Sequence, residues 1–214
     1  MADVLHFGAA VAGARALCVF VHGRGQSPEA MVDHVVRHLP QDVAYALPRA
    51  AGGSWYVARA VDALTDVTRA ELAASLSQVE AAIANLRRAS AAPLLLAGFS
   101  QGGCLSLELA SAGRARPDAV AALTGCRVGL ASDDRPLAAA PGLPVYLTGG
   151  DRDPWIPLAA FADAAADMGA QGAALRADVF PGRAHEVSAV EIAMLAAMLS
   201  DLGEGRMPRM EAPR

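Results

Sequence analysis

Short, continuously apolar runs alternate along the chain with longer segments in which apolar residues recur every three or four positions. Runs of strand length occupy residues 17–21, 43–47, 93–98, 119–124, 145–148 and 175–180. Several of them are continuously apolar and do not alternate with polar residues. This pattern is typical of strands that are buried on both faces of a mostly parallel sheet.

The longer segments carry the start and stop signals of helices. Ser27 followed by Pro28 is typical of an N-cap and a first-turn proline, and Pro40 should stop that helix. A long helix is predicted over the region in which apolar residues recur at spacings of four and three. These residues are Leu72, Leu76, Val79, Ile83 and Leu86.

Two further helices are predicted in the second half of the chain. One opens at Pro157 and can be capped by Gly169. The other opens at a capping box formed by Ser188 and Glu191. Its expected buried face consists of Ile192, Leu195, Leu199 and Leu202.

Strands that alternate with helices predict right-handed crossovers and an α/β fold with a mostly parallel, doubly wound sheet. We expect one domain over residues 1–203 and a flexible tail over 204–214. About twenty residues separate Thr124 from Pro144, too few for a large helical cap. In sheets of this type, ligands bind past the carboxyl ends of the strands, so the candidate chemistry should lie there.

Composition narrows the class of protein. The chain is 54% hydrophobic and 19% charged, as in globular proteins, and its formal net charge is −4. Lys and Arg form no stripe, so neither nucleic acid nor an anionic membrane surface is an expected partner. No apolar run reaches membrane-spanning length, and Asp3, Gly13 and Arg15 interrupt the N-terminal region. We therefore expect a soluble cytoplasmic protein without integral membrane association.

Cysteine usage indicates neither a disulfide framework nor a zinc site. The chain has three cysteines, Cys18, Cys104 and Cys126, at wide spacings. Cys18 stands inside an apolar run, and Cys104 stands near the start of a predicted helix. We expect all three to be buried structural thiols, because free cysteine behaves mostly as a small hydrophobic residue.

A candidate nucleophile stands at the end of the run 93–98. Gly98, Ser100 and Gly102 form the pattern G-x-S-x-G, with an apolar strand before it and an apolar helix after it. A serine on a sharp strand-to-helix turn exposes its hydroxyl, and large side chains two residues away on either side would clash. The alternative is a glycine-rich turn with a serine of no special importance.

A serine hydroxyl needs a neighbouring base, and in this type of fold the chain order is serine, acid, histidine. Of the five histidines, only His185 follows Ser100, and it lies just past the last predicted strand. Asp153 and Asp151 both follow the strand at 145–148. Asp153 is the preferred acid because the proline after it favours an extended backbone, whereas Asp151 could brace the turn.

A candidate oxyanion hole combines two backbone N–H groups. One belongs to Gln101, directly after the candidate nucleophile, and the other to Arg24, in the loop after the run 17–21. His22 precedes the serine and should support this loop by hydrogen bonding. The Arg24 side chain could point to solvent or meet an anionic substrate, and the sequence leaves both open.

Four motifs occur together in one order: VHGRG at 21–25, GFSQGG at 98–103, GDRDPWIP at 150–157 and GRAH at 182–185. Together they resemble the phospholipase/carboxylesterase family, which includes the acyl-protein thioesterases. The resemblance implies an α/β-hydrolase fold, a triad of Ser100, Asp153 and His185, and neither a metal nor another cofactor. It also implies Arg24 and Gln101 as the backbone oxyanion donors.

Two residues depart from the acyl-protein thioesterase branch of this family. The thioesterase branch usually has Leu where Arg24 stands, and a smaller apolar residue where Trp155 stands. The segment at 53–56 resembles a branch of bacterial carboxylesterase-like proteins. The resemblance therefore implies esterase chemistry and does not imply the removal of palmitoyl groups from proteins.

The expected function is hydrolysis of small to medium carboxylic esters or thioesters by a monomer or a homodimer. Lactone or amide hydrolysis on the same fold, and a non-catalytic binding protein, are the alternatives. A dienelactone-type hydrolase would have cysteine where Ser100 stands. Adjacent aromatics can line a pocket or merely anchor their loop on the core. Candidate pocket residues are His22, Gly23, Trp55, Tyr56, Trp155 and Ile156.

Overall fold

The apolar runs form the central strands of the computed structural model, which describes residues 3–211. All six predicted strands are present, with ends within two residues of the prediction. A seventh strand precedes them. The strands are β1 Val4–Gly8, β2 Ala16–Val21, β3 Val43–Pro48, β4 Leu94–Phe99, β5 Ala119–Leu123, β6 Pro144–Gly150 and β7 Ala174–Phe180.

The strands form one sheet in the order β1-β3-β2-β4-β5-β6-β7. β1 pairs antiparallel with β3, and all the other pairs are parallel. The sequence prediction missed β1 because this edge strand is only partly buried and lacks a continuous apolar run. The observed sheet confirms the predicted α/β fold, and its parallel strands place the carboxyl ends of β2, β4 and β6 along one edge.

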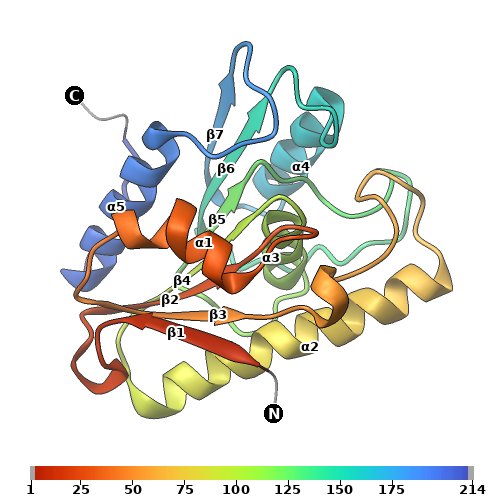
Figure 1. Ribbon diagram of the computed structural model, residues 1–214. Helices are drawn as coiled ribbons and strands as arrows, with labels where there is room; N and C mark the ends of the chain where they lie inside the picture. The colour runs from red at the N-terminus through yellow and green to blue at the C-terminus, as the bar shows by residue number, and fades with distance from the viewer. Residues whose placement is uncertain (1–2, 212–214) are drawn as a thin grey trace.

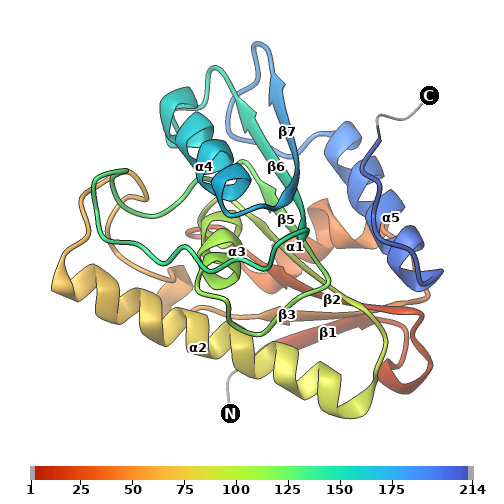
Figure 2. The ribbon, with the colours of Figure 1, turned by 180° about the vertical axis from the view of Figure 1, so that it is seen from behind.

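Within residues 3–211, five helices cover the two faces of the sheet (Figures 1 and 2). α2, α3 and α4 pack on one face, and α1 and α5 pack on the other. Short 3-10 turns lie at Val11–Gly13, Val36–His38 and Ala51–Gly53. The helices are α1 Pro28–His34, α2 Asp66–Ala89, α3 Gln101–Ser111, α4 Leu158–Ala170 and α5 Ala189–Gly203.

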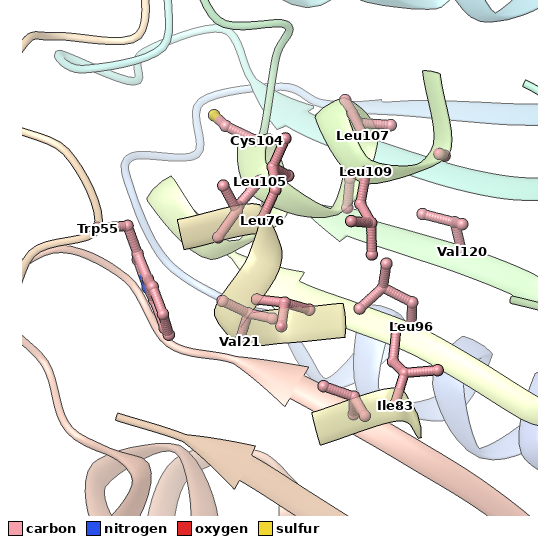
Figure 3. Packing of buried hydrophobic residues seen from close by; sticks show 14 of the residues in the cluster. Val21, Trp55, Leu76, Ile83, Leu96, Cys104, Leu105, Leu107, Leu109 and Val120 are labelled. Atoms are coloured by element: carbon pink, nitrogen blue, oxygen red, sulfur yellow. The ribbon is translucent and has the colours of Figure 1, made fainter. Parts of the chain in front are cut away.

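Burial on both faces explains the continuous apolar runs. In β2, Leu17, Val19 and Val21 pack toward α2 and α3, whereas Cys18 and Phe20 pack toward α1 and α5. Figure 3 shows how side chains from α2 and α3 meet those of the sheet. Burying an aliphatic or aromatic side chain of this size stabilises a fold by about 1.5–3 kcal/mol, so both layers contribute to the core.

The predicted helix signals mostly agree with the structure. Ser27 caps α1 through its Oγ, which accepts from the N–H of Ala30 at 3.3 Å. The capping box of Ser188 and Glu191 at the start of α5 is also present. α1 ends at His34, well before Pro40, because a 3-10 turn takes over the following residues.

The end of α4 differs from the prediction. Gly169 lies inside the helix, and the left-handed residue that reverses the chain is Gly172, with φ +80°. The N–H of Gly172 donates to the carbonyl of Gly169 at 2.9 Å. Only a residue without a Cβ adopts this backbone conformation at low cost, so the cap falls on Gly172.

Residues 204–211 follow α5 back along the body of the protein. Pro208 is buried, and a guanidinium N–H of Arg176 donates to the carbonyl of Met210 at 2.7 Å. The tail expected to be flexible therefore makes defined contacts as far as it is described, and its residues 212–214 lie outside the described residues. Across the part of the chain that the structure describes, no helix has both the length and the apolarity to cross a membrane.

The α4 terminus yields a matched pair of stability variants. A Cβ at Gly169 would meet nothing within 4 Å, so Gly169→Ala should raise the free energy of unfolding by about 0.5–1 kcal/mol. Gly172→Ala should lower it by about 1–2 kcal/mol, because alanine would be forced to a positive φ. Urea denaturation of both variants measures the two changes. If both variants changed the free energy of unfolding by the same amount in the same direction, Gly172 would not be the cap of α4.

Candidate active site

Ser100 occupies the turn between β4 and α3 in a backbone conformation that L-residues rarely adopt. Its φ is +56° and its ψ is −122°. Such a conformation costs about 1–3 kcal/mol and persists only when the surroundings impose it. The N–H of Ser100 donates to the carbonyl of Leu123 at 2.9 Å, which ties the turn to the end of β5.

Two glycines make this turn possible. A Cβ on Gly98 would lie 2.4 Å from the carbonyl carbon and oxygen of Gly102. A Cβ on Gly102 would lie 2.0 Å from the carbonyl oxygen of Val21, the last residue of β2. Both distances are far inside van der Waals contact, so neither position accepts a side chain. The steric demand predicted from G-x-S-x-G therefore matches the packing of this turn.

His185 and Asp153 lie beside Ser100 in a connected row. The Nε2 atom of His185 is 2.7 Å from the Oγ of Ser100, and its Nδ1 atom is 2.7 Å from an Oδ of Asp153. The Asp153 carboxylate is fully buried, whereas the imidazole is 18% exposed. The ring of Phe99 packs 5.1 Å from the imidazole, centre to centre.

The two candidate acids on the loop after β6 have different hydrogen-bond partners. The second carboxylate oxygen of Asp153 accepts from the N–H groups of Trp155 at 2.7 Å and Ile156 at 3.0 Å. These bonds fix the side chain with one oxygen toward His185. The carboxylate of Asp151 accepts instead from the N–H of Gly182, at 2.5 Å, and so braces the loop that carries the histidine.

A buried ion pair holds the loop that carries His185. Arg183 pairs with Glu191 of α5, and both side chains are almost fully buried. Thr148 of β6 also donates to Glu191, and Arg183 donates to the Oγ1 of Thr124 at 3.1 Å. The guanidinium also lies 4.4 Å from the ring centroid of Phe180. These contacts join the loop to the ends of β5 and β6.

The loop after β2 approaches Ser100 closely. A Cβ on Gly23 would lie 3.2 Å from the Cβ of Ser100. Gln101 is the first residue of α3, so its N–H has no partner within the helix. Among residues 3–211, the N–H groups of Arg24 and Gln101 donate no hydrogen bond. Both are therefore available to an oxygen bound beside Ser100.

His22 supports this loop from inside. It is buried, its Nε2 accepts from the N–H of Ala50 at 3.0 Å, and its Nδ1 lies 2.8 Å from the carbonyl of Gly23. Burial lowers the pKa of His22, which keeps the ring neutral and able to accept. Trp55 packs against the ring, and its indole N–H donates to the carbonyl of His22 at 2.9 Å.

The side chain of Gln101 has a role that the sequence prediction missed. Its Oε1 accepts from the N–H of Trp55 at 3.0 Å, and its Nε2 donates to the carbonyl of Tyr56 at 2.7 Å. The residue after the candidate nucleophile thus holds the loop between β3 and α2 against the site. The sequence did offer one indication of this role, because a polar side chain at the buried start of a helix needs hydrogen-bond partners.

A cleft of about 310 Å³ opens beside Ser100. Three candidate pocket residues, His22, Gly23 and Trp55, do not line it, because His22 and Trp55 use their polar atoms to fix the loops behind it. The sequence prediction also missed three lining residues, Arg59, Ala60 and Cys104. The lining residues are Arg24, Tyr56, Arg59, Ala60, Ser100, Gln101, Cys104, Trp155 and Ile156.

The three cysteines are buried free thiols, as predicted. Burial raises the pKa of the Cys18 thiol far above its usual value. The sulfur atoms of Cys104 and Cys126 lie 4.0 Å apart behind the cleft. Both belong to the buried cluster on this face of the sheet, and Figure 3 labels Cys104 in it.

Comparison with known proteins places this geometry in a family. The family model of phospholipases/carboxylesterases matches residues 9–202. The chain therefore belongs to the phospholipase/carboxylesterase family, as the four motifs indicated, and is a carboxylesterase/thioesterase-type α/β-hydrolase. Curated protein sequences give no significant match.

Solved structures share the fold at low sequence identity. A phospholipase/carboxylesterase from Dyadobacter fermentans is 24% identical with a TM-score of 0.83, over 94% of this chain and 97% of that one. Acyl-protein thioesterase 2 from Zea mays is 18% identical with a TM-score of 0.74, over 95% and 100%. The Bacillus cereus carboxylesterase is 13% identical with a TM-score of 0.75, over 94% and 95%.

Removing one partner of the buried ion pair behind His185 should be strongly destabilising. Glu191→Gln leaves the Arg183 charge buried without a counter-charge, so the free energy of unfolding should fall by about 3–5 kcal/mol. Glu204→Gln removes an exposed partner of Arg206 and should cost less than about 1 kcal/mol. Chemical denaturation of both variants tests the contrast, and similar losses would contradict the assigned role of Glu191.

Proposed function

We propose that this protein hydrolyses carboxylic esters or thioesters through an acyl-enzyme formed on Ser100, with His185 as general base and Asp153 as the acid that orients it. The observation that carries the proposal is the pair of 2.7 Å separations that link Ser100, His185 and Asp153. Membership of the phospholipase/carboxylesterase family supports the same chemistry.

The first half-reaction acylates the serine. The Oγ of Ser100 attacks the substrate carbonyl while its proton passes to the Nε2 of His185. The carbonyl oxygen then carries the negative charge of a tetrahedral intermediate. When that intermediate collapses, the bond to the leaving oxygen or sulfur breaks, and His185 returns its proton to the leaving group. The acyl group stays on Ser100 as an ester.

The second half-reaction uses water as the nucleophile. His185 takes a proton from the water, which attacks the acyl-enzyme carbonyl. A second tetrahedral intermediate forms and collapses, and the proton returns to Ser100. The products are the carboxylic acid and the free enzyme. Asp153 keeps its negative charge throughout, because its role is to hold the Nδ1 proton of His185 and stabilise the imidazolium.

The oxyanion is bound by backbone groups in this proposal. The N–H groups of Arg24 and Gln101 donate no hydrogen bond among residues 3–211, and Gly23 lets its loop approach Ser100. Each such donor contributes about 3 kcal/mol to stabilising the transition state. The positive end of α3 adds to the same effect, since Ser100 precedes its first residue.

The cleft suits small to medium acyl groups. Its volume of about 310 Å³ is at the low end for ligand pockets. Residues 125–143, which would carry a cap, contain neither helix nor strand, so the cleft has no helical cover from this segment. Trp155, 62% exposed, forms part of the rim.

Labelling with a fluorophosphonate tests the nucleophile. Peptide mass spectrometry should find one adduct, on Ser100, and the purified protein should turn over p-nitrophenyl acetate and butyrate. Ser100→Ala should keep the circular dichroism spectrum and the thermal midpoint but lose both the adduct and turnover. Full turnover by a folded Ser100→Ala protein would end the proposal.

The choice of acid is tested by a matched pair of amide variants. Asp153→Asn should lower kcat for p-nitrophenyl butyrate by about 10⁴-fold, because an amide cannot hold the required tautomer or balance the imidazolium. Asp151→Asn keeps an oxygen acceptor for Gly182 and should cost less than about tenfold. Steady-state kinetics measures both, and equal losses would remove Asp153 from its assigned role.

A further inference from the structure

Two arginines and no acidic residue line the cleft beside Ser100. Arg24 and Arg59 both line it, and none of the nine lining residues is Asp or Glu. The chain as a whole has a formal net charge of −4, so the positive charge of this cleft is opposite in sign to the net charge of the protein. The other seven lining residues carry no charged side chain, so the two arginines call for a physical explanation.

Neither guanidinium is neutralised within the described residues. Arg24 donates to the backbone carbonyls of Val57 and Ala58, which carry no net charge, and this uses two of its five N–H donors. Among residues 3–211, the Arg59 side chain has no hydrogen-bond or ion-pair partner, and no carboxylate pairs with Arg24. Both charges therefore remain available to a bound group.

The two carboxylates bonded to this loop contact backbone N–H groups and neither guanidinium. Asp62 accepts from the backbone N–H of Arg59 at 3.0 Å, and Glu71 accepts from the backbone N–H of Val57 at 2.9 Å. These two bonds hold the loop between β3 and α2. Asp153, behind His185, uses one oxygen on the imidazole and the other on two backbone N–H groups.

We infer that the preferred ester substrates carry an anionic group, a carboxylate or a phosphate, which binds Arg59 with support from Arg24 while the ester carbonyl lies at Ser100. This inference rests on the proposed function. Guanidinium groups bind both kinds of anion through paired N–H donors, and charge-assisted hydrogen bonds are stronger than neutral ones. Because Ser100 and Arg59 line the same small cleft, the anion belongs to a short substrate.

The test compares ethyl esters that differ only in their far end. The probes are monoethyl succinate, ethyl 3-phosphonopropanoate and the neutral ethyl succinamate, with ethanol release as the readout. We expect kcat/KM for at least one anionic ester to exceed that for the neutral amide by about tenfold. The better of the two anions identifies the group. Equal values for all three would overturn the inference.

Variants assign the preference to Arg59. Arg59→Gln should lower the ratio of anionic to neutral kcat/KM to near one, and Arg59→Lys should restore part of it. Arg88→Gln, which removes an exposed arginine from α2, is the control and should leave the ratio unchanged. A ratio that stays at its wild-type value in Arg59→Gln would overturn the assignment. If the Arg59 side chain merely stabilised the loop, Arg59→Gln would lower kcat/KM for all three ethyl esters by the same factor.

The two proposals fail in different ways. If the protein hydrolyses p-nitrophenyl butyrate but does not distinguish the three ethyl esters, the anion site is wrong and the proposed function stands. If no ester is hydrolysed and no fluorophosphonate adduct forms in a folded sample, the proposed function fails, and the anion site fails with it.

Discussion

The left-handed backbone of Ser100 depends on two positions at which the chain has no side chain. Gly98 and Gly102 allow the end of β4, the start of α3 and the end of β2 to meet at distances that any Cβ would forbid. The cost of the strained serine is about 1–3 kcal/mol, and the packed layers around the turn offset it. Once the turn is fixed, the hydroxyl lies at the sheet edge beside the first N–H of α3, which donates no hydrogen bond within residues 3–211.

The partners of Ser100 reach it from loops that buried polar contacts hold in place. Asp153 is fixed by two backbone N–H groups, and the loop of His185 by the pair of Arg183 and Glu191. A buried ion pair is costly to desolvate, so it adds little net stability, but removing one partner is expensive. Such a pair therefore specifies one arrangement of the loop more than it strengthens the fold.

Much of the fold was predictable because burial on both faces leaves continuous apolar runs in the sequence. β1 was not predictable, since the sequence of a partly exposed edge strand resembles that of a loop. The predicted helix end at Gly169 was wrong because the sequence offers two glycines near the same place, and only the tertiary path selects Gly172. Chain order and strand ends were enough to bring Ser100, Asp153 and His185 together.

The lining of the cleft was less predictable, because the direction of a loop side chain is set by contacts distant in sequence. Trp55 looked like a pocket residue, yet its indole N–H finds the carbonyl of His22 inside the protein. Its neighbour Tyr56 faces the cleft. Arg59 follows in the same irregular loop, where no periodic pattern marks it. Only the folded loop, held by Gln101, brings Arg59 to the cleft that Ser100 also lines.

The most direct test of the account is a crystal structure of the protein after reaction with diethyl p-nitrophenyl phosphate. We expect the phosphorus on the Oγ of Ser100 and one phosphoryl oxygen about 2.7–3.1 Å from the N–H groups of both Arg24 and Gln101. That result would establish the turn, the nucleophile and the oxyanion donors together. An adduct on another residue, or a phosphoryl oxygen directed away from both N–H groups, would contradict the central claim.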